Sequence, residues 1–271
     1  MESKIRSRYL REFISEIQYK NRNPHNVKAL EMLNELDTNP VRLLPSGREL
    51  FRCRIIGENS KVNSEKDFYG FGKEESFVPP PEVTRDLRAN YRYIPYLYCS
   101  NDPYTALVEV RPRLGSRVSV ATIRVNEDLR LLDFTLANVP PKMTEAKKNL
   151  FADLSTLYSK PVTGSDDILD YIPTQYIAEY AKNLGYDGII FTSSLLPEIH
   201  EDARTALSSN LLYSKINFDR FNVVVFNYHK CEAVKSNVVE TFRDFMEFRQ
   251  RDEDEHRLQV KSVLNEMLTK I

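Results

Sequence analysis

Apolar positions near the start of the chain repeat every three or four residues. Between residues 3 and 36 this spacing is typical of amphipathic helices. Pro24 interrupts the repeat and predicts two helices, the second over 27–36. No motif that carries chemistry lies here. We therefore interpret residues 1–47 as a helical N-terminal extension, packed either on the main domain or against a partner.

Further along, apolar and polar positions alternate, which predicts strands. In LFRCRII the alternation places Arg52 and Arg54 on one face and apolar side chains on the other. The segments SRVSVATIRV and LRLLDF, joined by the polar turn NED, are expected to form a strand pair. Shorter strands are predicted for IPYLYCS, GIIF and FNVVVFN. Residues 57–92 show little periodicity and are expected to form a long irregular loop.

Capping residues mark the later helices. Asp102 and Pro103 are suited to the N-cap and first positions of a helix through TALVEVR. An amphipathic helix is expected over 141–160. In YIPTQYIAEYAKNLGYDG, Pro173 is expected to begin a helix and Gly185 to end it.

The C-terminal segment is rich in charge, and its apolar residues are spaced as on a helix. From Asn237 to Ile271 it predicts a charged helix. The domain organisation expected is an extension over 1–47, a catalytic domain over 48–235 and a C-terminal helix over 236–271. Strands interspersed with a few helices predict an α+β fold.

Composition narrows the class of protein. The 271 residues are 41% hydrophobic and 28% charged, as in a soluble globular chain. Thirty-eight basic against thirty-nine acidic residues give a net charge of −1, which argues against nucleic acid or an anionic membrane as partner. No segment has the pattern of a signal peptide or a transmembrane helix. We expect a cytoplasmic protein.

Several kinds of site are excluded by motif. The three cysteines are widely spaced, and the four histidines are scattered without ligand spacing, so no metal site is expected. The sequence contains no GxSxG, HExxH, GxxxxGK[ST] or GxGxxG motif.

Glu109 is the first candidate site residue, because it lies in the apolar stretch TALVEV. A carboxylate on the inner face of a helix is costly unless it is paired, so it should meet a cation or a ligand hydroxyl. The alternative is that Glu109 faces water and pairs with Arg113 one turn later.

Other candidates follow from the predicted strands. The guanidinium groups of Arg52 and Arg54 suit phosphate pairs, unless they lie on a solvated strand face. Tyr98 shares a face with another tyrosine and could stack on a flat cationic ring, or simply pack in the core. Ser193 and Ser194 follow the strand GIIF, where ligands often bind, although turns also use serine.

The order of these segments resembles that of the RES domain family, named after an Arg, a Glu and a Ser. The resemblance covers about residues 48–230 and is carried by FRCR, RAN, PYLYCSNDPYTALVEVRP and PTQYIAEYAKNLGYDGIIFTSS. The chain departs from the family pattern around RAN, where Leu87 precedes and YRY follows in place of Gly and Pro-Gly. The family geometry therefore does not transfer to this loop.

The resemblance implies a fold like that of ADP-ribosyltransferases, with a mixed β core and flanking helices. It implies a toxin that cleaves the nicotinamide–ribose bond of NAD⁺ by hydrolysis or phosphorolysis, without a metal, and that a cognate antitoxin neutralises. The resemblance carries over Arg52 with Arg54 as a close second, Tyr98, Glu109, Ser193 with Ser194 one position on, and Arg88 of RAN.

Two other functions stay open on the sequence. A transferase of the same fold would place ADP-ribose on one macromolecular target. A non-catalytic binding module would use Glu109 and the arginines as structural ion pairs. The helical ends pack either on the domain or across a homodimer.

Overall fold

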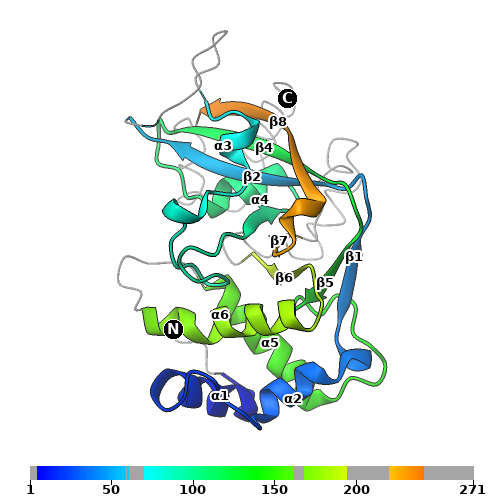
Figure 1. Cartoon of the computed structure of the whole chain (residues 1–271). Helices are drawn as coiled ribbons and strands as arrows, with labels where there is room; N and C mark the ends of the chain where they lie inside the picture. Colours follow the sequence, from blue (N-terminus) through cyan, green and yellow to red (C-terminus); the bar gives the residue numbers. More distant parts are fainter. Residues whose placement is uncertain (1–4, 59, 61–69, 161–167, 194–219, 241–271) are drawn as a thin grey trace, which may run out of the picture.

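In the residues that the structure describes, eight strands form one sheet (Figure 1). The computed structural model describes residues 5–58, 60, 70–160, 168–193 and 220–240. The strands are β1 (Val41–Leu44), β2 (Glu49–Ile56), β3 (Leu97–Ser100), β4 (Arg117–Val125), β5 (Leu129–Asp133), β6 (Gly188–Thr192), β7 (Phe221–Val225) and β8 (Cys231–Glu240). Their order is β1-β5-β6-β7-β3-β2-β4-β8. Only β5 and β6 pair in parallel within this sheet of described strands.

Helices cover both faces of this sheet. They are α1 (Arg8–Tyr19), α2 (Lys28–Asn34), α3 (Lys73–Ser76), α4 (Pro103–Glu109), α5 (Glu145–Ser159) and α6 (Ile168–Asn183), with short 3₁₀ turns at Leu36–Thr38, Pro81–Val83 and Tyr228–Lys230. Helices α1, α2, α5 and α6 gather at one end of the molecule (Figure 1). The predicted α+β class is confirmed.

The N-terminal helices pack on the domain. Leu10 and Phe13 of α1 share one buried cluster with Ile177 and Ala178 of α6. Strand β1 also lies in the segment predicted as an extension, yet it pairs with β5 and joins the sheet. The sequence analysis did not predict this strand.

The two faces of β2 belong to different hydrophobic clusters. Cys53 packs with Ala106 and Leu107 of α4. Leu50, three positions earlier and therefore on the opposite face, belongs to a second cluster with Ala121 of β4. The predicted alternation of β2 and β4 is confirmed.

The predicted pairing of 116–125 with 129–134 is wrong. Strand β4 pairs with β2 and β8, whereas β5 pairs with β1 and β6. The turn between β4 and β5 therefore links strands in different parts of the sheet. Periodicity identifies strands but does not identify their neighbours.

The helix predicted from Asn237 is wrong over residues 237–240. These residues end β8, which pairs along β4 from Cys231 to Glu240. Val238 and Val239 are β-branched and suit a strand. Residues 241–271, where the rest of that helix was expected, lie outside the described residues. Strand β8 also crosses the domain boundary predicted at residue 235.

Helix α6 begins at Ile168, so Pro173 lies inside the helix rather than at its start. Proline cannot donate to the carbonyl four residues earlier. That carbonyl, of Leu169, instead accepts from the Gln18 side chain at 2.7 Å. Contact with α1 therefore lets α6 extend past Pro173. The predicted end is confirmed, because Gly185 follows the helix with a φ of +83°.

The capping prediction for α4 is also confirmed. The Asp102 carboxylate accepts from the Thr105 backbone N–H at 2.9 Å, and Pro103 is the first helical residue. This cap fixes where α4 starts, and α4 ends at Glu109.

Candidate active site

A cavity of about 610 Å³ lies beside α4, a size usual for small-molecule sites. Consecutive residues of β2 and of β3 border it, so both faces of the sheet contribute to its lining. A row of side chains from four neighbouring strands lines it. Ser100 on β3 is paired with Phe51 on β2 and with Asn222 on β7, which is paired with Phe191 on β6. Paired residues of adjacent strands point to the same face. The sheet thus supplies one wall of the cavity.

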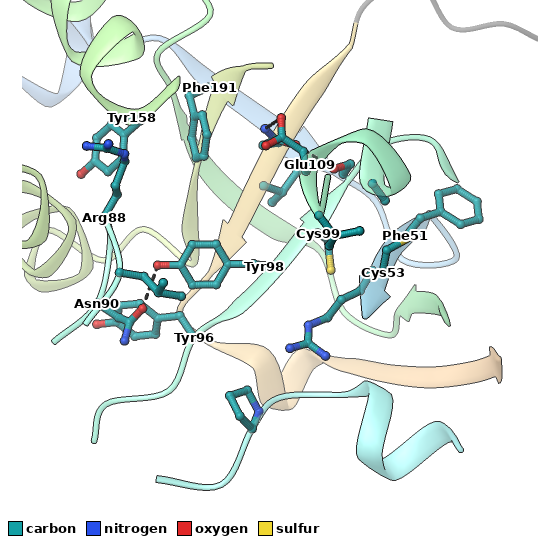
Figure 2. A pocket seen from close by; sticks show the side chains of 18 of the residues that line it. Phe51, Cys53, Arg88, Asn90, Tyr96, Tyr98, Cys99, Glu109, Tyr158 and Phe191 are labelled. Carbon is teal, nitrogen blue, oxygen red and sulfur yellow. Dashed lines mark hydrogen bonds between the residues drawn. The ribbon is translucent and has the colours of Figure 1, made fainter. Parts of the chain in front are cut away.

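Glu109, the last residue of α4, lines this cavity (Figure 2). Its Oε1 accepts a hydrogen bond from Ser193 Oγ at 2.6 Å and another from Asn222 Nδ2 at 2.7 Å. No described residue donates to Oε2. The carboxylate therefore turns toward the cavity rather than toward bulk solvent. It meets a hydroxyl and an amide of the protein, not the cation considered from the sequence.

The structure brings together two of the predicted catalytic residues, Glu109 and Ser193. Ser193 follows β6 and is 7% exposed. Since its hydroxyl donates to Glu109, it is the serine that matters to the geometry described. Ser194, the alternative, lies outside the described residues.

Asn222 is a site residue that the sequence analysis missed. It lies in the apolar strand FNVVV and is 8% exposed. A buried amide is costly unless it is hydrogen-bonded. That cost was the signal in the sequence that could have identified Asn222.

Arg52 and Arg54 share one face of β2, as predicted, but both also bind helix α3. Arg52 Nη1 donates to the Ser76 carbonyl at 2.8 Å, and Arg54 Nη1 donates to the Glu75 carbonyl. Arg54 also lies over the Phe71 ring, 4.0 Å from its centroid. These contacts hold α3 on the sheet.

Only Arg52 of the two lines the cavity within the described residues. It leaves β2 on the face opposite to Cys53, so it does not share a face with Glu109. It borders the cavity where β2 and β3 pair at a single position, Phe51 with Ser100. Burial lowers the pKa of the Arg52 guanidinium to about 10, so it stays charged near neutral pH.

Tyr98 lies at the cavity and is held through its hydroxyl (Figure 2). The hydroxyl donates to Asn90 Oδ1 at 2.8 Å and accepts from the Ala89 N–H at 3.2 Å. Burial raises the pKa of this phenol well above its usual value. Tyr98 is therefore a neutral, fixed ring beside the cavity.

The RAN segment forms a tight turn despite its departure from the family pattern. Leu87 and Asn90 bond each other's backbone, at 3.1 and 3.4 Å. Gln175 of α6 holds the turn, because its Nε2 donates to the Asn90 carbonyl at 2.8 Å and the Leu87 carbonyl at 3.0 Å. Gln175 is 1% exposed and was not singled out from the sequence.

This turn presents Arg88 to the cavity. Arg88 is 6% exposed, and its guanidinium carbon lies 5.1 Å from the centroid of the Tyr171 ring. The basic residues that line the cavity are Arg52, Arg85, Arg88, Arg111 and Lys160. Glu109 is the single carboxylate among the described lining residues. A cavity with five cations and one carboxylate favours an anionic ligand.

The described residues contain no group of three His, Cys, Asp or Glu placed to hold a metal ion. The cysteines Cys53, Cys99 and Cys231 are buried and free. In the described part of the chain, no helix is long and apolar enough to cross a bilayer.

Comparison with protein families decides the affiliation of the chain. The model of the RES domain matches residues 64–243, about two thirds of the sequence. This chain belongs to the RES domain family. Glu109 and Ser193 lie inside the matched range, whereas Arg52 precedes it. Membership confirms the resemblance read from the sequence.

Two further comparisons were made. No curated protein matches the chain. Among solved structures it is similar to one described as the crystal structure of the M. tuberculosis MbcT–MbcA toxin–antitoxin complex. That match has 12% sequence identity and a TM-score of 0.42, and it covers 79% of this chain and 92% of the other.

Proposed function

We propose that this RES domain protein cleaves the nicotinamide–ribose bond of NAD⁺ and acts as a toxin by depleting NAD⁺. The observation that carries the proposal is Glu109, fixed by Ser193 and Asn222 in a cavity whose other charged lining residues, among those described, are all cations. A dinucleotide with two phosphates and a positively charged pyridinium ring needs this combination of charges.

The chemistry requires a carboxylate close to the ribose. When the glycosidic bond breaks, its electron pair leaves with nicotinamide, which departs neutral, and positive charge develops on the ribose. A carboxylate and hydrogen bonds to the ribose hydroxyls stabilise such a transition state. Water or phosphate then bonds to the anomeric carbon; when water attacks, it releases one proton. In our proposal Oε2 of Glu109 faces the ribose, because Oε1 already accepts two hydrogen bonds.

The other residues bind the substrate in this proposal. Arg52 and Arg88 hold the pyrophosphate, since guanidinium groups bind phosphates in a bidentate manner. Tyr98 offers its ring to the nicotinamide, whose positive charge favours an aromatic face and is lost in the reaction. Ser193 orients Glu109. The proposal requires no metal, because the leaving group needs no protonation.

We also propose that an antitoxin covers the cavity, as the family resemblance implies. Val83 and Leu87 line the cavity, and they are 64% and 40% exposed. Exposed apolar side chains beside a site are typical of a surface that binds a protein. Release of nicotinamide by the purified protein should therefore stop when the product of a neighbouring antitoxin gene is added.

The test is proton NMR of the purified protein with NAD⁺, with and without phosphate. Free nicotinamide is the expected product. A dependence of its rate on phosphate distinguishes phosphorolysis from hydrolysis. If NAD⁺ stays intact, the protein is next incubated with cell lysate and labelled NAD⁺, and labelled macromolecules are sought. A single labelled macromolecule would replace the proposal with an ADP-ribosyltransferase, and no labelling together with no calorimetric binding of NAD⁺ would leave a binding module.

A further inference from the structure

Asn222 belongs to a line of hydrogen bonds that crosses the sheet. Ser100 Oγ lies 2.7 Å from Asn222 Oδ1, and Asn222 Nδ2 lies 2.7 Å from Glu109 Oε1. All of these bonds lie beside the cavity. Ser100 is 3% exposed and Asn222 is 8% exposed, so water has little access to either side chain.

The direction of these bonds follows from chemistry. An ionised carboxylate only accepts hydrogen bonds, so the amide nitrogen of Asn222 must face Glu109. The amide oxygen then faces Ser100, and the Ser100 hydroxyl must be the donor. The order of the line is therefore Ser100 to Asn222 to Glu109.

Asn222 of β7 and Ser193, which follows β6, donate to the same oxygen of Glu109. Two donors on one oxygen fix the rotation of the carboxylate. The other oxygen has no donor among the described residues.

We infer that Asn222, oriented by Ser100, is a positioning residue that fixes the rotation of the Glu109 carboxylate and leaves one of its oxygens free for the substrate. The inference rests on the proposed function where activity is measured, but the hydrogen bonds can be tested without activity.

The cavity is suited to a test by pH. Glu109 is the single carboxylate among its described lining residues. The cations Arg52, Arg85, Arg88, Arg111 and Lys160 line it too. Burial raises the pKa of each thiol and phenol that lines it, which are Cys53, Cys99, Tyr96, Tyr98 and Tyr158. A carboxylate introduced at position 222 would therefore be the only other acidic side chain in the described lining.

The decisive variant is Asn222→Asp, which replaces the donor with a second carboxylate. Two adjacent carboxylates retain a proton to a higher pH, by about one to three pH units. We expect the acid limb of the rate of nicotinamide release to move up by that amount. The matched control is Asn227→Asp. Asn227 also donates to a carboxylate, that of Asp187 at 3.2 Å, but it does not line the cavity. Its acid limb should not move.

The second variant, Asn222→Leu, removes the donor without adding charge. Loss of a hydrogen bond to a charged group should lower kcat by about ten- to a hundredfold, with a smaller change in KM for NAD⁺. Ser100→Ala keeps the amide and removes the group that orients it, so a smaller fall in kcat is expected.

Circular dichroism establishes which variants fold. If Asn222→Asp folds and its acid limb coincides with that of the wild type, the inference is wrong. If only Ser100→Ala folds, an unchanged kcat overturns it.

If the wild-type protein released no nicotinamide, the proposed function would be refuted, but the role of Asn222 could still be tested. The carboxyl carbon of Glu109 is then followed by ¹³C NMR, identified by its absence in Glu109→Gln. Its titration should lie at higher pH in Asn222→Asp than in the wild type. Coincident titrations would refute the role of Asn222 independently of any activity.

Discussion

Two walls of the cavity are stabilised by hydrogen bonds with different acceptors, a carboxylate at one wall and backbone carbonyls at the other. At the first wall, Ser193 and Asn222 donate to the Glu109 carboxylate. At the second, Gln175 donates to the backbone carbonyls of the turn that carries Arg88. The first network positions a charged carboxylate, and the second maintains the backbone conformation of a turn. Changes at the first wall should therefore lower kcat, whereas changes at the second should raise KM and reduce stability.

Glu109→Gln should have the largest effect. It preserves the shape of the side chain but removes the charge that faces the ribose, so the rate of nicotinamide release should fall by about a hundredfold or more. Initial rates at saturating NAD⁺ give kcat. A variant with the rate of the wild type would show that Glu109 is not the catalytic carboxylate and would remove the distinction between the walls.

Arg52→Gln and Arg54→Gln extend the comparison to β2. Both arginines donate to carbonyl groups of α3, so both substitutions should reduce stability to a similar extent. Only Arg52 lines the cavity, and loss of a charged contact to phosphate should raise KM by about tenfold. Steady-state kinetics of the two variants provide the check. Equal KM values would place the pyrophosphate elsewhere.

Gln175→Leu should test the second wall. Removal of the amide leaves the buried carbonyls of Leu87 and Asn90 without this donor, which should lower the free energy of unfolding by about 1–3 kcal/mol. Urea denaturation measures the loss, and KM should rise severalfold because the turn loosens. In the control, Gln18→Leu, the lost bond goes to Leu169, away from the cavity. That variant should lose stability and keep its KM; a fall in kcat alone for Gln175→Leu would contradict the assignment.

Tyr98→Phe should have the smallest effect on the kinetics. It removes the hydrogen bonds of the hydroxyl with Asn90 and Ala89 but keeps the ring, so about 1–3 kcal/mol of stability should be lost. KM for NAD⁺ should change by less than about threefold, because stacking needs the ring and not the hydroxyl. Thermal melts and kinetics check this, with Tyr186→Phe as control, since Tyr186 bonds Asn39 outside the cavity. A large rise in KM would mean that the hydroxyl contacts the substrate.

Much of the local structure was predictable from the sequence. Asp102 and Pro103 predicted the start of α4, and alternation predicted the two faces of β2 and β4. These features depend on residues close together in the chain. The exceptions are instructive: Pro173 lies inside α6 because Gln18, far away in sequence, binds the carbonyl that proline leaves without its helical partner.

The candidate site was only partly predictable. Glu109, Ser193 and Tyr98 were singled out from the predicted helix and strands, and Arg88 from the order of segments that resembles one family. Gln175 lies in one of those segments but was not singled out. Asn222 lies in none of them, although a buried amide in an apolar strand was a usable signal. The contact between residues 109 and 222 spans more than a hundred positions in the sequence. Local sequence periodicity does not predict contacts between residues so far apart.

Local periodicity and the order of motifs were sufficient to predict the α+β class, the caps, most of the strands and the family. The three-dimensional structure was needed to show that β5 pairs with β6 in parallel, that residues 237–240 extend β8, and that Arg52 and Glu109 lie on opposite faces of the sheet. Packing across the whole sheet selects the hydrogen-bonding partners of each strand. The neighbours of a residue in the chain largely set its local conformation, but they do not determine which distant residues it contacts in the folded protein.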